Sequence, residues 1–174
     1  MDTLKSKIRD VPDFPKAGII FKDITTLLKD GDAYFRSIEE LAARFNADDI
    51  DKVLGVESRG FIFAAALAYK WKKGLVLVRK PGKLPGEKLL QKYELEYGTD
   101  AVEIHLDAIQ KGERVLVVDD LLATGGTISA AVKLTERLGG KVIGIGFLIE
   151  LTFLNGRNLL NDYRVESLIQ YDVE

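Results

Sequence analysis

The segment from Val115 to Thr127 constrains the fold of this chain more than any other part of the sequence. Its first four residues, Val115 to Val118, are apolar without polar alternation, which is typical of a strand covered on both faces in a parallel sheet. Two carboxylates follow, Asp119 and Asp120. Apolar residues then recur at roughly helical spacing from Ile128 to Leu138. The pattern therefore predicts a buried strand, an acidic turn and a helix in direct succession.

The turn from Thr124 to Thr127 has the composition of an anion site. Thr127 is the expected N-cap of the helix, so free backbone N–H groups and the positive helix end would point to one spot, which suits a phosphate. Asp119 and Asp120 are placed to accept hydrogen bonds from a sugar that carries this phosphate. Because a loop also needs glycine merely to turn, and an acidic pair is often only solvated, the pattern alone leaves a structural role open.

Other nucleotide-binding motifs fit less well. A Walker A loop is excluded because no Gly-Lys-Ser/Thr follows the strand, and a Walker B strand without Walker A makes no nucleotide site. The Rossmann fingerprint fails as well, since Gly144-Ile145-Gly146 lacks the third glycine. These glycines lie inside an apolar run, and we interpret them as strand residues that pack under a neighbouring side chain.

Strand and helix patterns alternate along the rest of the chain. A short helix is expected over residues 4–10, a helix capped by Asp32 runs as far as Phe45, and another spans Phe61–Trp71. Further strands are predicted at Val53–Val56, Leu75–Val78 (of the fully buried type), Lys141–Leu148 and Ser167–Tyr171. This alternation indicates an α/β domain with a mainly parallel sheet flanked by helices.

Two segments fit neither pattern. Residues 11–27 contain two prolines and are apolar yet irregular, so we expect a packed, non-repetitive surface. Residues 80–100 are rich in proline, glycine and charge and are the least globular stretch. The alternation over residues 102–107 then predicts a half-exposed strand, in which His105, the only histidine, lies at the surface without a role.

Polar residues follow three of the predicted strands. They are Glu57-Ser58-Arg59, Arg79-Lys80 and Asp119-Asp120. Because ligands of parallel sheets bind beyond the carboxyl ends of the strands, these groups should converge. Acids at one strand end and Arg, Lys and Ser at two others suit a ligand with several phosphates and a sugar.

Composition narrows the class of protein. The 174 residues predict one domain, and a net charge of −2 provides no bulk electrostatic case for nucleic acid or an anionic membrane. The absence of cysteine excludes disulfides, thiolate metal sites and cysteine nucleophiles. No apolar run approaches about 18 residues, and the N-terminus has no apolar signal core. We expect a cytoplasmic protein without nucleic-acid or membrane partners.

Four segments in order resemble the adenine phosphoribosyltransferases of the type I phosphoribosyltransferase family. They are similar to that family's base-binding segment, pyrophosphate loop, mobile loop and phosphoribosyl-pyrophosphate (PRPP) motif: Phe14–Ile24, Gly55–Phe61, Arg79–Gly86 with Tyr93–Gly98, and Val115–Thr127. Lys22 stands where an arginine is common, and Glu57 where an aspartate is often found. The resemblance covers almost the whole chain.

The resemblance implies a fold, a reaction and partners. The fold is that of type I phosphoribosyltransferases: a single domain over residues 1–174, with a small hood at about 11–27 and a mobile lid loop at about 82–101. The reaction is adenine plus PRPP giving AMP and pyrophosphate, a step of purine salvage, with Mg²⁺ held mainly by PRPP and water. The family is usually a homodimer. Its pyrophosphate loop commonly contains a non-proline cis peptide, which would be Glu57–Ser58 here.

The resemblance also implies roles for individual residues. The ribose hydroxyls would bind Asp119 and Asp120, whose charge also favours a cationic sugar. Since adjacent strand residues point to opposite faces, at least one of the two should lie beyond the strand end. Glu96 would handle the proton at adenine N7, and the catalytic set would be Glu96, Arg59 and the acidic pair. The other expected contacts are the 5′-phosphate with Ala123, Thr124, Gly125, Gly126 and Thr127, pyrophosphate with Glu57, Ser58, Arg59, Arg79, Lys80 and Lys83, and adenine with Phe21, the backbone of Ile20 and Lys22, Leu151 and Phe153.

Three alternatives stay open. A phosphoribosyltransferase for xanthine, hypoxanthine or orotate would share the fold and the PRPP chemistry, and only the base pocket would differ. A PRPP-binding regulator usually carries an added nucleic-acid module or a basic face, for which 174 residues and a charge of −2 leave little room. A pyrophosphokinase that makes PRPP would need an ATP site, and the sequence offers no motif for one.

Overall fold

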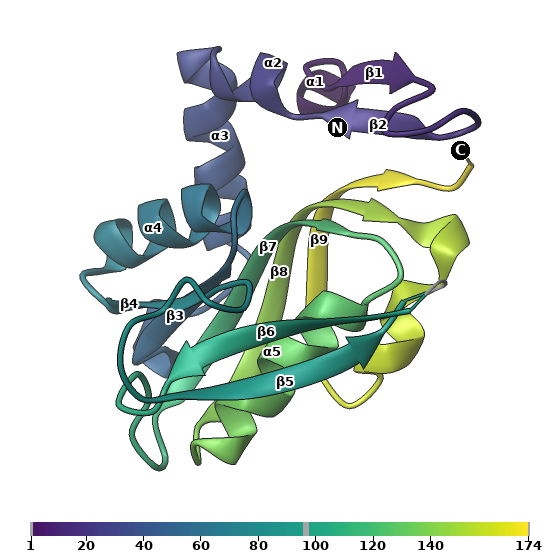
Figure 1. Ribbon diagram of the computed structural model, residues 1–174. Coiled ribbons are helices and arrows are strands. Elements are labelled where there is room, and N and C mark those ends of the chain that lie inside the picture. The colour runs from purple at the N-terminus through teal and green to yellow at the C-terminus, as the bar shows by residue number, and fades with distance from the viewer. Residues whose placement is uncertain (1, 96–97, 174) are drawn as a thin grey trace.

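A five-stranded parallel sheet lies at the centre of the computed structural model, which describes residues 2–95 and 98–173 (Figure 1). The strand order is β4-β3-β7-β8-β9, and each neighbouring pair is parallel. In chain order the strands are β3 (Lys52–Val56), β4 (Gly74–Val78), β7 (Arg114–Leu122), β8 (Lys141–Leu151) and β9 (Val165–Tyr171). The predicted α/β class and each of the predicted sheet strands are confirmed.

The apolar run of β7 is buried on both faces, as its lack of alternation predicted. Val115 and Val117 join the apolar cluster on one side of the sheet, and Leu116 and Val118 join the cluster on the other. The prediction of full burial was wrong for β4, where Leu75 and Leu77 are exposed. The reason is that β4 lies at the edge of the sheet, so only one of its faces enters the core.

Helices cover the two faces of the sheet (Figure 1). On one side α3 (Gly31–Ala42) and α4 (Gly60–Trp71) contribute to the first cluster, and on the other α5 (Gly126–Arg137) contributes to the second. Asp30, and not Asp32, caps α3, because its carboxylate reaches the backbone N–H of Ala33 at 3.1 Å. The short helices are α1 (Asp2–Lys5), α2 (Thr25–Leu28), η1 (Ala47–Asp49), η2 (Thr152–Leu154) and η3 (Gly156–Leu160).

The glycines of β8 pack under an aromatic ring, as predicted. A Cβ atom on Gly144 would lie 2.6 Å from Cε1 of Phe45, and one on Gly146 would lie 3.2 Å from Cε2. The close approach of this ring requires residues without side chains at both positions.

The N-terminal segment forms a small antiparallel sheet that lies over the carboxyl-terminal ends of the central strands (Figure 1). It consists of β1 (Arg9–Pro12) and β2 (Ile20–Asp23), so the expectation of a non-repetitive surface was wrong, and the first helix ends at Lys5. Lys5 Nζ donates to the carbonyl of Gln170 at 2.8 Å, which ties this hood to β9. The hairpin pairing was hidden because its strands are only four residues long.

A second antiparallel hairpin, β5 (Lys88–Glu94) with β6 (Thr99–His105), occupies most of the segment predicted as a mobile loop. The alternation in β6 indicated a half-exposed strand, yet Glu103 is buried and Leu106 is exposed. The backbone of Glu103 also pairs with that of Arg79, so β6 is covered where the alternation predicted solvent. No helix in the described ranges is long and apolar enough to cross a membrane.

Candidate active site

The acidic pair lies inside β7 and not beyond its end. The ladder with β8 continues through Asp119↔Phe147 to Leu122↔Glu150, so the prediction that one acid lies past the strand was wrong. Asp119 Oδ1 accepts a hydrogen bond from the backbone N–H of Asp120 at 2.8 Å. The pairing register therefore holds both carboxylates at the carboxyl edge of the sheet.

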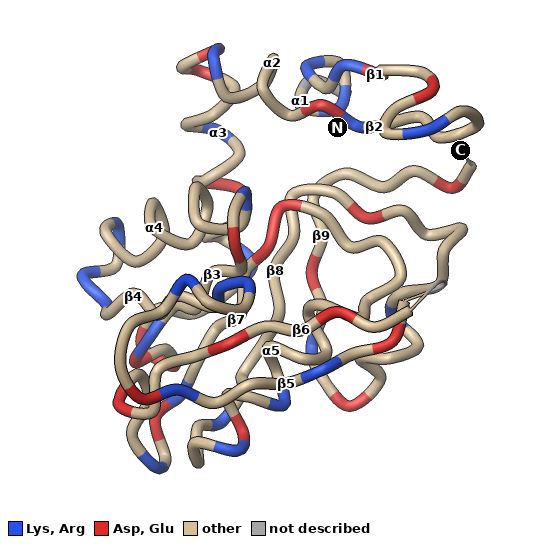
Figure 2. Tube along the Cα trace, in the orientation of Figure 1, with Lys and Arg blue, Asp and Glu red and all other residues tan. Residues whose placement is uncertain are grey.

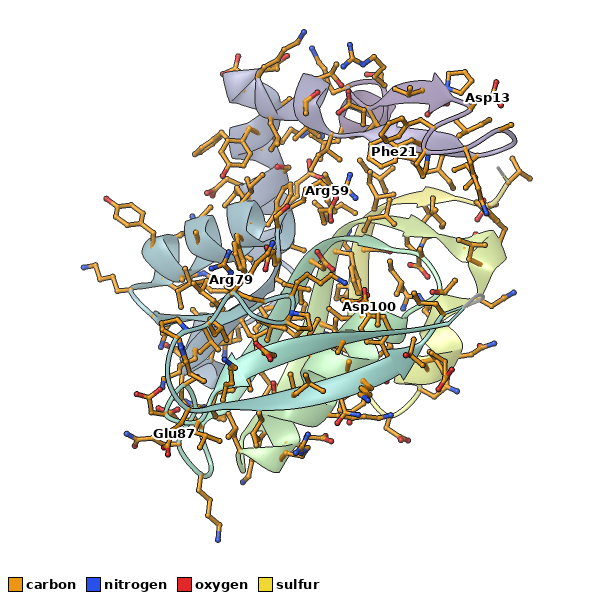
Figure 3. The ribbon with its side chains drawn as sticks, viewed as in Figure 1. Asp13, Phe21, Arg59, Arg79, Glu87 and Asp100 are labelled. Atoms are coloured by element: carbon orange, nitrogen blue, oxygen red, sulfur yellow. The ribbon has the colours of Figure 1, made fainter. Side chains whose placement is uncertain are left out.

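Asp120 is buried, and among the described residues its one ion-pair partner is Arg59. Arg59 Nε lies 2.9 Å from Asp120 Oδ2, and within the described residues this oxygen has no hydrogen-bond partner with suitable geometry. The Arg59 guanidinium also lies over the ring of Phe21, 5.0 Å from the centroid. Figure 3 shows Phe21 on the hood side, Asp100 on the hairpin side and Arg59 between them. Arg59 thus connects the acidic strand end with the hood.

Burial changes the acidity of the pair. It raises the pKa of Asp119 well above its usual value, and the neighbouring Asp120 carboxylate raises it further. Burial also raises the pKa of Asp120, although Arg59 opposes this effect. Two partly satisfied carboxylates at one place are costly for folding and are typical of a functional site.

Asp119→Asn is expected to stabilise the ligand-free protein above about pH 4. An acid whose folded pKa is raised loses stability as pH rises from its unfolded value, because ionisation then costs free energy only in the folded state. Asparagine keeps the oxygen that accepts from Asp120 and never ionises. The Tm at pH 8 should rise by about 2–4 °C for each kcal/mol of ionisation free energy that the substitution removes from the folded state. The difference in Tm between variant and wild type should shrink towards pH 4. Calorimetry across pH checks this, and an unchanged or lower Tm at pH 8 would contradict it.

The Glu57 carboxylate contacts three of the basic residues that follow β4. It contacts Arg79 Nε at 3.3 Å, the backbone N–H of Lys80 at 2.9 Å, and Lys83 Nζ. Burial alone would raise the pKa of Glu57, but the hydrogen bonds from Lys83, Lys80 and Arg79 outweigh it and the pKa is lowered. A charged carboxylate positions cations and does not itself hold an anion. The cis peptide Glu57–Ser58 is present, as the resemblance predicted.

Glu103, a buried acid on β6, forms hydrogen bonds with the same basic segment. Glu103 Oε2 accepts from the backbone N–H of Gly82 at 3.1 Å, and its backbone exchanges two hydrogen bonds with Arg79. Figure 2 shows this basic segment after β4, in blue, on the same side of the sheet as the red end of β7. Sequence reasoning missed Glu103, because the alternation placed it on the solvent face.

The turn after β7 forms a pocket of about 90 Å³ lined by Asp119 and residues 121–128. Gly125, with φ of 86°, is the N-cap of α5, so the prediction of Thr127 as N-cap was wrong. The left-handed conformation begins the helix two residues earlier and leaves the Thr127 hydroxyl free to donate to Tyr93 Oη at 3.0 Å. The turn and the N-terminal end of α5 line this pocket, and such a place is typical of an anion site.

Tyr93 links the hairpin to this turn. Its hydroxyl donates to Asp100 Oδ2 at 3.0 Å and accepts from Lys80 Nζ at 2.9 Å, and Lys80 also forms an ion pair with Asp100. The hydrogen bond from Lys80 is the main cause of the lowered pKa of Asp100. The Lys80 side chain therefore turns towards the phosphate-type turn, away from the Glu57 cluster that contains Arg79 and Lys83. No local sequence pattern pointed to Asp100.

The residues expected at the base come from the hood and from the end of β8. Phe21 lies in β2 and meets Phe14 edge to face, with 5.2 Å between centroids. The Lys22 side chain is buried, forms an ion pair with Asp10 at 2.9 Å and lies over the ring of Tyr171. Ile20, Leu151 and Phe153 are half-buried. Glu96 and Tyr97, the expected lid residues, lie outside the described residues.

Known proteins are similar to this chain in sequence and in fold. A family model for the phosphoribosyl transferase domain matches residues 25–171. A curated adenine phosphoribosyltransferase from Geobacter metallireducens is 59% identical over 171 residues, which are 98% of this chain and 100% of that protein. This chain belongs to the adenine phosphoribosyltransferase family.

Solved structures of the adenine phosphoribosyltransferase family have the same fold. The enzyme from Thermoanaerobacter pseudethanolicus is 56% identical with a TM-score of 0.95, covering 98% of this chain and 99% of that one. The enzyme from Saccharomyces cerevisiae, solved with an imino-altritol bisphosphate and adenine, is 39% identical with a TM-score of 0.87, covering 94% and 95%. The type I phosphoribosyltransferase fold predicted from four motifs is confirmed.

Proposed function

We propose that this protein transfers the 5-phosphoribosyl group of PRPP to N9 of adenine and releases AMP and pyrophosphate. The observation that carries the proposal is the convergence of three groups at the carboxyl edge of the sheet. These are the acidic pair of β7, the turn before α5 and the basic residues after β3 and β4. The solved Saccharomyces cerevisiae relative binds adenine and a sugar-like bisphosphate, which supports both halves of the reaction.

The 5′-phosphate would bind the turn Ala123–Thr127. The residues of this turn line the pocket, so their backbone N–H groups and the hydroxyls of Thr124 and Thr127 would be the donors to the phosphate. Each charge-assisted hydrogen bond contributes about 1.5–3 kcal/mol. Thr127 would exchange its bond with Tyr93 for one with the phosphate.

The acidic pair would hold the ribose. Asp120 Oδ2 lacks a hydrogen-bond partner among the described residues, so a ribose hydroxyl would satisfy it. In the reaction the bond from the anomeric carbon to pyrophosphate breaks, its electron pair leaves with pyrophosphate, and the N9–carbon bond forms. The sugar becomes cationic in between, and the charges of Asp119 and Asp120 stabilise it.

The departing pyrophosphate would bind Ser58, Arg59, Arg79 and Lys83, with Lys80 near the sugar phosphate. Glu57 acts on these cations by holding Arg79 and Lys83 together. No group of three or more acidic, histidine or cysteine side chains within residues 2–95 and 98–173 is arranged to hold a metal ion. Mg²⁺ would therefore be held mainly by PRPP and water beside the acidic pair, and it would neutralise pyrophosphate charge.

Adenine would lie against Phe21, with Leu151 and Phe153 on its other side. Backbone groups of Ile20 and Lys22 would read its edge, since the Lys22 side chain is engaged with Asp10 and Tyr171. Arg59, which now covers Phe21, would turn towards pyrophosphate when the base enters.

Glu96 would take the N7 proton as N9 attacks the sugar. In Glu96→Gln, turnover should fall by about 10²–10⁴-fold while PRPP binding is retained, because only the general base is removed. Single-turnover kinetics and calorimetric titration of PRPP measure the two quantities. Unchanged turnover would refute the role.

One assay tests the function itself. Pyrophosphate release from PRPP with Mg²⁺ is measured with adenine, hypoxanthine, xanthine and orotate in separate reactions. Release with adenine alone supports the proposal, and release only with another base assigns the protein to a sister activity. If none of the four bases causes pyrophosphate release, the protein is a regulator that binds PRPP.

The protein would act as a homodimer. Tyr69 of α4 and Leu75 and Leu77 of β4 form exposed apolar surface at the sheet edge, which fits an interface between subunits. Sedimentation velocity at micromolar concentration tests this proposal.

A further inference from the structure

An ion pair between a buried carboxylate, Glu150, and a partly exposed arginine, Arg157, links the two ends of the segment that follows β8. Arg157 Nε donates to Glu150 Oε1 at 2.6 Å, and Arg157 Nη2 donates to Oε2 at 2.7 Å. Ser167 Oγ donates to the same carboxylate at 2.6 Å, and Arg157 Nη1 donates to the carbonyl of Val165 at 2.9 Å. The Glu150 side chain is only 4% exposed. Two-pronged contact with a buried carboxylate holds the arginine in one geometry.

The electrostatics keep this pair charged. Burial alone would raise the pKa of Glu150, but the hydrogen bonds from Arg157 and Ser167 outweigh it, and the pKa is lowered. The Glu150 carboxylate touches none of the groups proposed to meet the substrates, so the reaction as described above does not use it.

The segment that the pair closes carries parts of two substrate sites. Between its ends lie Leu151 and Phe153, the proposed cover of adenine. At its far end Gly156 packs directly behind the phosphate turn. A Cβ atom on Gly125 would lie 2.6 Å from the carbonyl oxygen of Gly156, and one on Gly156 would lie 2.2 Å from that of Ala123. Glu150 itself is the register partner of Leu122, directly before the turn.

We infer that Glu150 and Arg157 are positioning residues that set the base site and the 5′-phosphate site at a fixed separation. The inference rests on the proposed function, because it assigns the two sites that the segment joins. AMP spans both sites, so the spacing between adenine cover and phosphate turn has to match the length of one nucleotide. A change in this spacing weakens contacts that substrates and transition state make equally, and losing such uniform binding raises KM while kcat is kept.

The chain offers a matched control at the opposite end of the sheet. Arg114 forms the same two-pronged contact with Asp51, with Nε–Oδ2 at 3.0 Å and Nη2–Oδ1 at 2.8 Å. It lies at the first residue of β7, whereas Glu150 lies at the end of β8. Arg114→Met therefore removes an ion pair with the same two contacts, to a more exposed carboxylate, without touching either substrate site.

The test compares Arg157→Met, Arg157→Lys and Arg114→Met with the wild type. In Arg157→Met the KM values for adenine and for PRPP should both rise about 10–100-fold, while kcat changes less than about threefold. Arg157→Lys should be intermediate, because a lysine keeps the charge but makes a single contact. Arg114→Met should lower Tm with both KM values unchanged. If Arg157→Met does not fold, Arg157→Lys carries the comparison.

Two readouts separate this inference from the proposed function. Hydrogen exchange at residues 123–127 and 151–156 should accelerate together in the Arg157 variants and stay at the wild-type rate in Arg114→Met. Ribose 5-phosphate, titrated by calorimetry, should bind more weakly only in the Arg157 variants. Unchanged exchange at either segment, or a lower Tm with wild-type KM values, overturns the inference. A wild type that binds ribose 5-phosphate but releases no pyrophosphate overturns the proposed function alone.

Discussion

Asp120→Asn is expected to lower kcat/KM for AMP formation by about 10²–10³-fold, because it removes a negative charge aimed at the cationic sugar from a site with little water. The side chain is buried and its Oδ2 atom is 2.9 Å from Arg59 Nε. Asparagine has nearly the same shape, so packing should be preserved. Steady-state kinetics with adenine and PRPP measure the effect.

The Tm of the variant and a matched surface substitution are the controls for this prediction. Burial raises the pKa of Asp120, so an uncharged replacement should not lower the Tm. Asp48→Asn makes the same chemical change at an exposed position in η1, near the amino end of β3, and should leave kcat/KM at the wild-type value. A loss below about threefold in Asp120→Asn would show that the carboxylate does not act on the sugar.

Gly125→Ala is expected to raise the KM for PRPP at least about tenfold and to lower stability. Gly125 has φ of 86°, and an added Cβ atom would lie 2.6 Å from the backbone oxygen of Gly156. The left-handed conformation alone costs a non-glycine residue about 1–2 kcal/mol. The backbone contact adds to this cost, because a main-chain oxygen cannot turn aside as a side chain does.

Gly112→Ala separates the two causes. Gly112 has nearly the same φ of 89°, but no atom lies within 4 Å of the added Cβ position. It should therefore lose stability through the backbone conformation alone and keep the wild-type KM. Equal KM values in Gly125→Ala and the wild type would refute the 5′-phosphate assignment. Chemical denaturation and initial rates measure the two effects.

Much of the sheet followed from local pattern. The apolar run of β7 has no alternation because an apolar cluster covers each of its two faces. A strand that is buried on both faces has no position for a solvent-exposed polar side chain. The interpretation of Gly144 and Gly146 was also correct. Two glycines in a buried strand indicate that a neighbouring side chain approaches closely, and this side chain is Phe45. The polar residues that follow such strands lie at the carboxyl edge of the sheet, where the proposed binding site is.

Helix starts and short strands were less predictable. Asp30 and Gly125 cap α3 and α5, where Asp32 and Thr127 were expected. Two acceptable caps within two or three residues differ only in the backbone dihedrals that the rest of the fold imposes. The hood hairpin and β5 were likewise missed, since few residues in them are buried and their hydrophobic signal is weak.

The sequence by itself determined the α/β class, the positions of the main strands along the chain, the acidic strand end and the phosphate-type turn, because each depends on residues that are neighbours in the chain. Only the tertiary structure placed Glu103 behind the basic segment, Tyr93 and Asp100 beside the turn, and Glu150 on Arg157 behind Gly156. These contacts join residues on different elements. No local spacing encodes them, because they form only when packing of the core brings separate elements together.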